Sequence, residues 1–167
     1  MKFGAMAVIL AGTIYAYKQP QKISLQGETV IADTIGKSDI IVKIKTHIVE
    51  TSELKDPRFA ITKSICPDPN NFNPCSLVDG IEIYVNHDTV IVPVSVYSSL
   101  FNLDDVIISK NKMGYQLLFN GADASEGYTL KVRFNSIKVK QTELGGGECS
   151  GSRPDEVNNY APPDTCN

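Results

Sequence analysis

Apolar and polar residues alternate along several short segments of this chain, with the period of two that is typical of half-buried β-strands. In residues 39–50, isoleucine and valine occupy one face, and the polar face carries Lys43, Lys45 and His47. Similar patterns predict strands at residues 81–85, 89–94, 106–108, 115–119, 128–134 and 137–144. Residues 59–65 form a weaker candidate strand.

Turn-forming residues separate these segments at hairpin spacings. Asn86, His87 and Asp88 predict a tight turn between two strands, because all three residue types tolerate positive φ. Asn135 and Ser136 are expected to form a two-residue turn in the same way. Residues 95–103 have apolar positions at spacings of four and three, which predicts one short helix with Ser95 as its N-cap.

The order of these elements predicts an all-β fold, a mainly antiparallel sandwich or open barrel with one short helix. We expect the β domain to span residues 17–145. Three consecutive glycines at 145–147 are expected to end it, and residues 146–167 then form a disulfide-tied tail.

The first residues have a different character. Lys2 is followed by an apolar run over residues 3–16, which is typical of a secretory signal peptide that is cleaved after Ala16. A membrane anchor or a buried structural element is the alternative. No other apolar run approaches the length that spans a bilayer, so we expect a periplasmic or secreted protein without a membrane span.

The four cysteines support export, because disulfides persist in oxidising compartments. Cys66 and Cys75 flank a segment rich in proline and asparagine, and Cys149 and Cys166 flank a second polar segment. Turn formers bring the ends of each segment together, so we expect two local disulfides. A zinc site is disfavoured because neither spacing resembles a zinc knuckle.

Peptide mapping under non-reducing conditions should therefore yield a peptide linking Cys66 to Cys75 and another linking Cys149 to Cys166. Each loop closure should contribute about 2.5–3 kcal/mol through the entropy of the unfolded chain. A peptide linking Cys66 to Cys166 would refute local pairing.

The net charge of −3 is too small to indicate a nucleic-acid partner. The two-residue turn at 135–136 would, however, place Arg133 opposite Lys138 and Lys131 opposite Lys140. Like charges directly opposite each other destabilise a sheet. We therefore expect a basic sheet face that docks an anionic partner, built from Lys43, Lys45, Lys131, Arg133, Lys138 and Lys140. In the alternative, neighbouring glutamates such as Glu50, Glu82 and Glu143 neutralise it.

Enzyme chemistry is hard to assemble from this sequence, and we expect no cofactor and no catalytic site. His87 is interpreted as a turn residue. His47 lies beside two lysines, which should lower its pKa, and no carboxylate near it in sequence would orient it as a base. Nucleophile elbows, phosphate loops and metalloprotease motifs are absent from the sequence.

The loop between the strands at 115–119 and 128–134 is the most distinctive one. Asp123, Ser125 and Glu126 are a candidate protein-contact tip, a weak candidate for Ca²⁺ ligation, or a plain polar connection. Residues 120–128, Asn-Gly-Ala-Asp-Ala-Ser-Glu-Gly-Tyr, resemble a GGDASESY-like segment of small uncharacterised exported bacterial proteins. The resemblance implies export from a bacterial cell and names no activity.

These observations favour an exported, non-enzymatic binding protein whose partner is a protein or an anionic component of the envelope. One alternative is an inhibitor of a periplasmic or extracellular hydrolase such as a lysozyme, with residues 123–126 entering a cationic cleft. A structural subunit of an envelope assembly and an enzyme of unspecified reaction are the others. The oligomeric state is left open.

Overall fold

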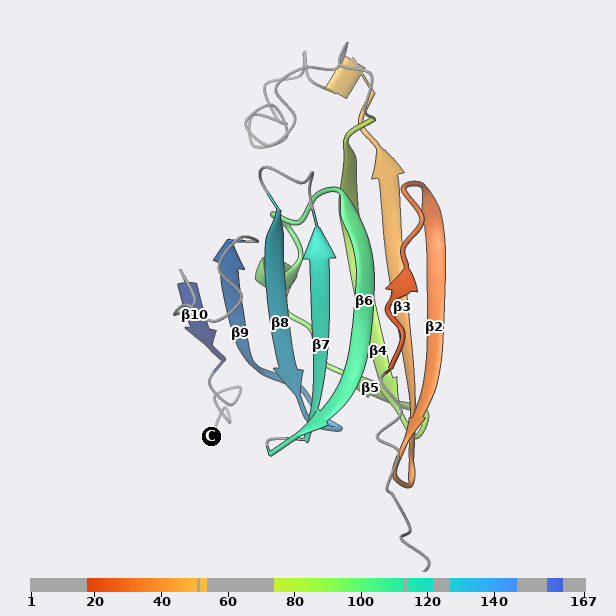
Figure 1. Cartoon of the computed structure of the whole chain (residues 1–167), viewed down its shortest axis with the longest axis vertical. Helices are drawn as coiled ribbons and strands as arrows, with labels where there is room; N and C mark the ends of the chain where they lie inside the picture. The colour runs from red at the N-terminus through yellow and green to blue at the C-terminus, as the bar shows by residue number, and fades with distance from the viewer. Residues whose placement is uncertain are drawn as a thin grey trace, which may run out of the picture.

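Two antiparallel β-sheets pack face to face in the computed structural model (Figure 1). The structure describes residues 18–50, 52–53, 74–112, 114–121, 127–146 and 156–160. The predicted all-β sandwich is therefore confirmed.

One sheet has six strands in the order β1-β6-β7-β8-β9-β10. Its strands are β1 (Gln21–Lys22), β6 (Leu103–Asn111), β7 (Gly114–Gly121), β8 (Tyr128–Phe134), β9 (Val139–Gly146) and β10 (Glu156–Asn159). The other sheet has the order β2-β3-β4-β5 and contains β2 (Gly27–Ile35), β3 (Ser38–Ile48), β4 (Ser76–Val85) and β5 (Asp88–Val90).

The core lies between the sheets and follows from the alternation of side chains along each strand. Ile40, Val42 and Ile44 of β3 are fully buried, whereas Lys43 and Lys45 between them point outward. From the six-stranded sheet, Phe119 and Phe134 are fully buried as well. Burying each such side chain contributes about 1.5–3 kcal/mol, so the two inward faces hold the sandwich together.

Four hairpin turns lie at one end of the sandwich, the lower end in Figure 1: β2–β3, β4–β5, β6–β7 and β8–β9. In the β4–β5 turn, Asn86 and His87 have φ angles of 52° and 74°. The tight turn predicted there from residues that tolerate positive φ is confirmed.

The helix expected over residues 95–103 is replaced by a short 3-10 turn, Val94–Val96, followed by further turns. Val96, Leu100 and Leu103 are all buried, so the apolar spacing does mark core positions. The 3-10 turn and the turns that follow it bury these side chains without a helix, and Leu103 then starts β6.

The register predicted between β8 and β9 is wrong. Lys131 lies opposite Glu143 and Arg133 opposite Gln141, with an irregularity next to Phe134. The turn extends from Asn135 to Lys138, because the Asn135 side chain accepts hydrogen bonds from the backbone N–H groups of residues 137 and 138, at 2.9 Å each. The longer turn shifts β9, so the like charges are not paired across the strands.

The segment expected to be a loop-like tail contributes a strand. β10 pairs with β9 in antiparallel register from Glu156, opposite Leu144, to Asn159, opposite Gln141. The backbone N–H of Tyr160 also donates to the carbonyl of Lys140 at 2.9 Å. This segment forms an edge strand whose residues are all exposed. Its composition is polar, so no alternation of apolar residues indicates the strand in the sequence.

Several expectations fall outside the described residues: the signal peptide at 1–16, the weak strand at 59–65, and the loop residues Asp123, Ser125 and Glu126. Cys75 is disulfide-bonded, but Cys66, Cys149 and Cys166 also lie outside, so the pairing stays a prediction. In the part of the chain that is described, no helix is long and apolar enough to cross a membrane.

Gly121 has no side chain, which leaves space for Tyr128 to form hydrogen bonds with a neighbouring loop. The Tyr128 hydroxyl donates to the carbonyl of Phe101 at 2.7 Å and accepts from its backbone N–H at 3.2 Å. Burial raises the pKa of Tyr128 to about 12, so this hydroxyl stays protonated. A Cβ added at Gly121, which lies directly opposite, would come within 2.5 Å of the tyrosine ring.

Gly121→Ala should therefore lower the free energy of unfolding by about 1–3 kcal/mol, through overpacking and loss of these hydrogen bonds. Chemical denaturation measures the change. Gly80→Ala is the matched control, because a Cβ at Gly80 meets no atom within 4 Å, and should change stability by less than about 0.5 kcal/mol. Equal effects of the two substitutions on stability would show that Gly121 is not needed to make space for Tyr128.

Candidate functional site

The cations of the expected basic sheet face are mostly neutralised within the chain. Lys45 of β3 lies 3.1 Å from Glu82 and 4.0 Å from Glu28, on the strands to either side. Glu82 also accepts a hydrogen bond from the Tyr84 hydroxyl at 2.8 Å. This hydrogen bond, and then Lys45, lower the pKa of Glu82. Lys43 lies over the Tyr84 ring, with its Nζ 5.6 Å from the centroid.

The second half of the expected face is likewise paired. Arg133 of β8 binds Glu143 of β9 through both of its terminal nitrogens, with Nη2 to Oε2 at 3.1 Å. Lys131 lies 3.9 Å from the same carboxylate. The alternative in which neighbouring glutamates neutralise the face is correct for Lys45, Lys131 and Arg133. Among the described residues, the sheet face therefore lacks the cluster of unpaired cations that was expected.

Lysines gather instead at the end of the sandwich where the hairpin turns lie. We call this surface the basic end and define it by three turns: Lys37 in β2–β3, Lys110 and Lys112 at β6–β7, and Lys138 and Lys140 at β8–β9. Lys37, Lys110 and Lys112 are exposed, and Lys140 is half-buried.

Contacts between the turns hold this surface together. The Tyr115 hydroxyl at the start of β7 donates to Ser38 Oγ at 2.7 Å, which joins the β6–β7 and β2–β3 turns across the two sheets. A Cβ added at Gly114 would lie 2.7 Å from the carbonyl oxygen of Phe134, so the β6–β7 turn packs directly on the β8–β9 turn. The three lysine-bearing turns thus form one contiguous surface.

The β8–β9 turn is also tied to the segment that follows β5. Ile91 donates its backbone N–H to the carbonyl of Ile137 at 2.7 Å and accepts a hydrogen bond from Val139 at 3.0 Å. These bonds hold Lys138 at the corner between the two sheets, where it is buried. Burial, and then the nearby charge of Lys140, lower the pKa of Lys138.

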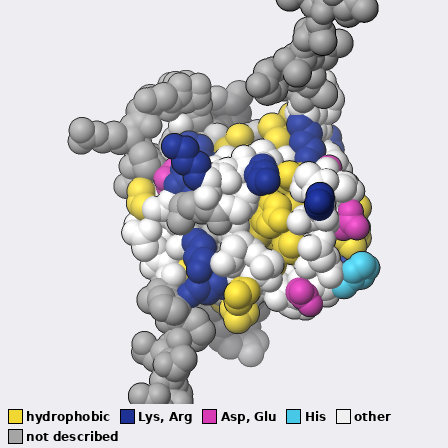
Figure 2. Space-filling model, turned by 90° about the horizontal axis from the view of Figure 1, so that it is seen from below, with side chains coloured by type: hydrophobic (Ala, Val, Ile, Leu, Met, Phe, Trp, Pro, Cys, Tyr) yellow, Lys and Arg dark blue, Asp and Glu magenta, His cyan; other side chains and the backbone are white. Residues whose placement is uncertain are grey.

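Carboxylates do not neutralise the other lysines of the basic end. Among the described residues, none lies within ion-pair distance of Lys37, Lys110, Lys112 or Lys140. Asp39 and Asp88 flank two turns of this end. Figure 2, which views it from below, shows lysine or arginine side chains on several sides of a hydrophobic centre, with acidic side chains at several places around the rim and a histidine at one edge. Sequence reasoning missed this surface because it considered charges along strands and not across turns.

A second cluster surrounds His47 at the opposite end of β3. The Nδ1 atom of His47 lies 2.7 Å from Asp79, which lies at the β3–β4 irregularity. The Nε2 atom lies 3.1 Å from Glu53, which also accepts the backbone N–H of Glu50 at 3.1 Å. The ring is therefore held between two carboxylates.

The expectation that His47 lacks a carboxylate partner and has a lowered pKa is wrong. Burial lowers the pKa of His47, but hydrogen bonds and attraction from Asp79 and Glu53 outweigh burial and raise it. The partner from β4 is distant in sequence, so the local pattern around His47 did not reveal it. Because both ring nitrogens are engaged by carboxylates, the arrangement suits a structural ion cluster better than a general base.

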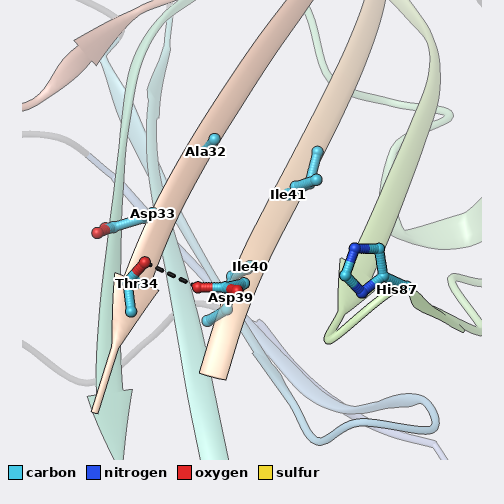
Figure 3. Close-up of a pocket in the computed structure, with 7 residues that line it drawn as sticks. All are labelled: Ala32, Asp33, Thr34, Asp39, Ile40, Ile41 and His87. Atoms are coloured by element: carbon cyan, nitrogen blue, oxygen red, sulfur yellow. Dashed lines mark hydrogen bonds between the residues drawn. The ribbon is translucent and has the colours of Figure 1, made fainter. Parts of the chain in front are cut away.

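A hollow of about 480 Å³ lies beside the β2–β3 and β4–β5 turns (Figure 3). Thr34 donates to the Asp39 carboxylate at 2.8 Å on one side, and His87 projects from the β4–β5 turn on the other. The remaining lining residues are Ala32, Asp33, Ile40 and Ile41. The hollow is open to solvent and provides few converging polar groups.

Within the described ranges, no group of three or more histidine, cysteine, aspartate or glutamate side chains is placed to hold a metal ion. Comparisons with protein-family models, with curated proteins and with solved structures found no match.

The His47 cluster makes stability depend on pH. The folded pKa of His47 is raised above the unfolded value of about 6.5. Its contribution is then fully present below about pH 6.5 and is lost as pH rises through the folded pKa. His47→Gln should consequently destabilise the protein more at about pH 5.5 than at about pH 8.5, as measured by urea denaturation at both values.

His87→Gln, which removes the other, exposed histidine, serves as the control and should retain the pH dependence of the unsubstituted protein. An equal loss of stability at both pH values for His47→Gln would show that the two carboxylates do not stabilise the charged ring.

Proposed function

We propose that this chain is an exported, non-enzymatic binding protein that docks an anionic partner through its basic end. The observation that carries the proposal is the position of Lys37, Lys110, Lys112 and Lys140, which have no carboxylate within ion-pair distance among the described residues. Lys45, Lys131 and Arg133 on the sheet faces have glutamate partners. The lysines of the three turns are instead gathered on one surface, although the chain as a whole has a net charge of −3.

Charge segregation of this kind has an energetic cost and a functional benefit. Like charges held close together repel each other; the pKa of Lys138 is lowered first by burial and then by its repulsion from Lys140. An anionic surface that approaches the turns removes the repulsion and attracts all the lysines at once. Because Lys37, Lys110 and Lys112 are exposed and Lys140 is half-buried, the attraction should weaken as salt screens it.

The other candidate functions have less support. Both ring nitrogens of His47 contact carboxylates, which leaves neither nitrogen to take a proton from a substrate. The inhibitor hypothesis depends on Asp123, Ser125 and Glu126, which lie outside the described residues. An assembly through a sheet edge is supported by the exposed strand β10, but nothing indicates which strand would join it.

The test is retention on immobilised heparin, a polyanion that contains no lipid. The variant K37Q/K110Q/K112Q/K140Q should elute at a clearly lower salt concentration than the unsubstituted protein, since four charges of the basic end are removed. The control K22Q/K43Q/K45Q/K131Q removes the same number of charges from the sheet faces and should elute near the unsubstituted protein.

Equal shifts in the two variants would mean that net charge alone governs retention, and the basic end would then have no special role. Thermal unfolding of each variant confirms that a lower elution position does not reflect loss of the fold.

A further inference from the structure

Two exposed isoleucines lie within the basic end, and the lysines alone do not explain them. Ile91 is 57% exposed and Ile137 is 62% exposed. The hydrogen bond from the Ile91 N–H to the Ile137 carbonyl holds them on neighbouring segments. Single exposed apolar residues are common on protein surfaces, but adjacent ones that share a surface with unpaired cations indicate an interaction site.

We infer that the basic end docks on the surface of an anionic phospholipid membrane, with the isoleucine side chains inserted below the head groups. This inference rests on the proposed function and names the partner of the same surface. The lysines of the three turns would contact phosphate groups around the inserted side chains, and the strands would stand end-on to the membrane.

The kind of cation favours lipid over an acidic protein. Protein interfaces are enriched in arginine and aromatic residues and depleted in lysine. The basic end contains only lysines, and the one arginine of the described residues, Arg133, is bound to Glu143. Lysine acts as a flexible point charge that needs no fixed geometry, and its stem can lie along apolar surface while its ammonium group reaches the head groups.

The shape of the surface supports the same partner. Ile137 lies at the tip of a hairpin turn, and Lys37 and Lys112 lie on two other turn tips at the same end. Figure 2 shows hydrophobic side chains in the middle of this end, with basic side chains on several sides of them. A fluid bilayer can accept separate protruding side chains, whereas a folded partner would need a matching cavity for each.

The arrangement also predicts how affinity should divide between charge and insertion. Each lysine near an anionic membrane strengthens binding about fivefold. Removal of four lysines should therefore almost abolish binding at moderate salt. Removal of both isoleucine side chains should weaken vesicle binding about tenfold or more, because several buried methylene groups are lost.

The experiment is sedimentation with vesicles of phosphatidylcholine containing about one third phosphatidylglycerol, compared with phosphatidylcholine alone. The unsubstituted protein should bind the anionic vesicles in a salt-dependent manner. K37Q/K110Q/K112Q/K140Q and I91S/I137S should each lose that binding. The control V30S/V157S removes two apolar side chains that are 54% and 43% exposed on other surfaces and should bind normally. Because all variants share residues 1–16, differences between them report the basic end.

Heparin retention distinguishes the proposed binding of an anionic partner from the inference that this partner is a membrane. I91S/I137S should keep the heparin retention of the unsubstituted protein while losing vesicle binding. Lysine-dependent retention on heparin without lysine-dependent vesicle binding would overturn the membrane inference and leave the proposed function standing, with an acidic protein or polysaccharide as the partner. Unchanged vesicle binding of I91S/I137S, or of I137S alone, would overturn insertion. Loss of neither interaction in the lysine variant would refute the proposed function itself.

Discussion

Burial of the two inward sheet faces is the constraint on which the rest of this structure depends. Side chains alternate along a strand, so every second position must be apolar to fill the space between the sheets. Ile40, Val42 and Ile44 on one sheet and Phe119 and Phe134 on the other meet this requirement. The charged residues between them are thereby directed to the outer faces, and those in the turns to the ends of the sandwich.

Position in the sheet then decides whether a cation is neutralised. On the outer faces, the antiparallel register places side chains of adjacent strands about 5 Å apart, and Lys45 and Arg133 meet Glu82 and Glu143 across the ladder. At the turns the neighbouring positions carry no such glutamates. Among the described residues, no carboxylate lies within ion-pair distance of Lys37, Lys110, Lys112 or Lys140, in or beside three adjacent turns. These lysines therefore accumulate on one surface, which gives a mildly acidic chain a basic end.

The β8–β9 hairpin shows how strongly one local interaction affects where charges are placed. The Asn135 side chain closes a four-residue turn by accepting two backbone hydrogen bonds. That turn sets a register in which Lys131 faces Glu143, whereas a two-residue turn would have set lysine against lysine. It also brings Ile137 and Lys138 to the tip, beside Ile91. The same turn thus prevents the expected cluster of like charges on the sheet face and helps to form the basic end.

The sequence alone determined the all-β class, the inward residues of β3 and β8, and the Asn86–His87 turn, because each depends on local alternation or on φ preferences. It did not reveal β2, where Val30 and Ala32 face outward and Asp33 inward, or β10, whose composition is polar. Tertiary structure alone decided the partners of His47, which come from distant segments, and the gathering of Lys37, Lys110 and Lys140. These residues are far apart in the chain, and only the packing of the two sheets places their turns at a common end.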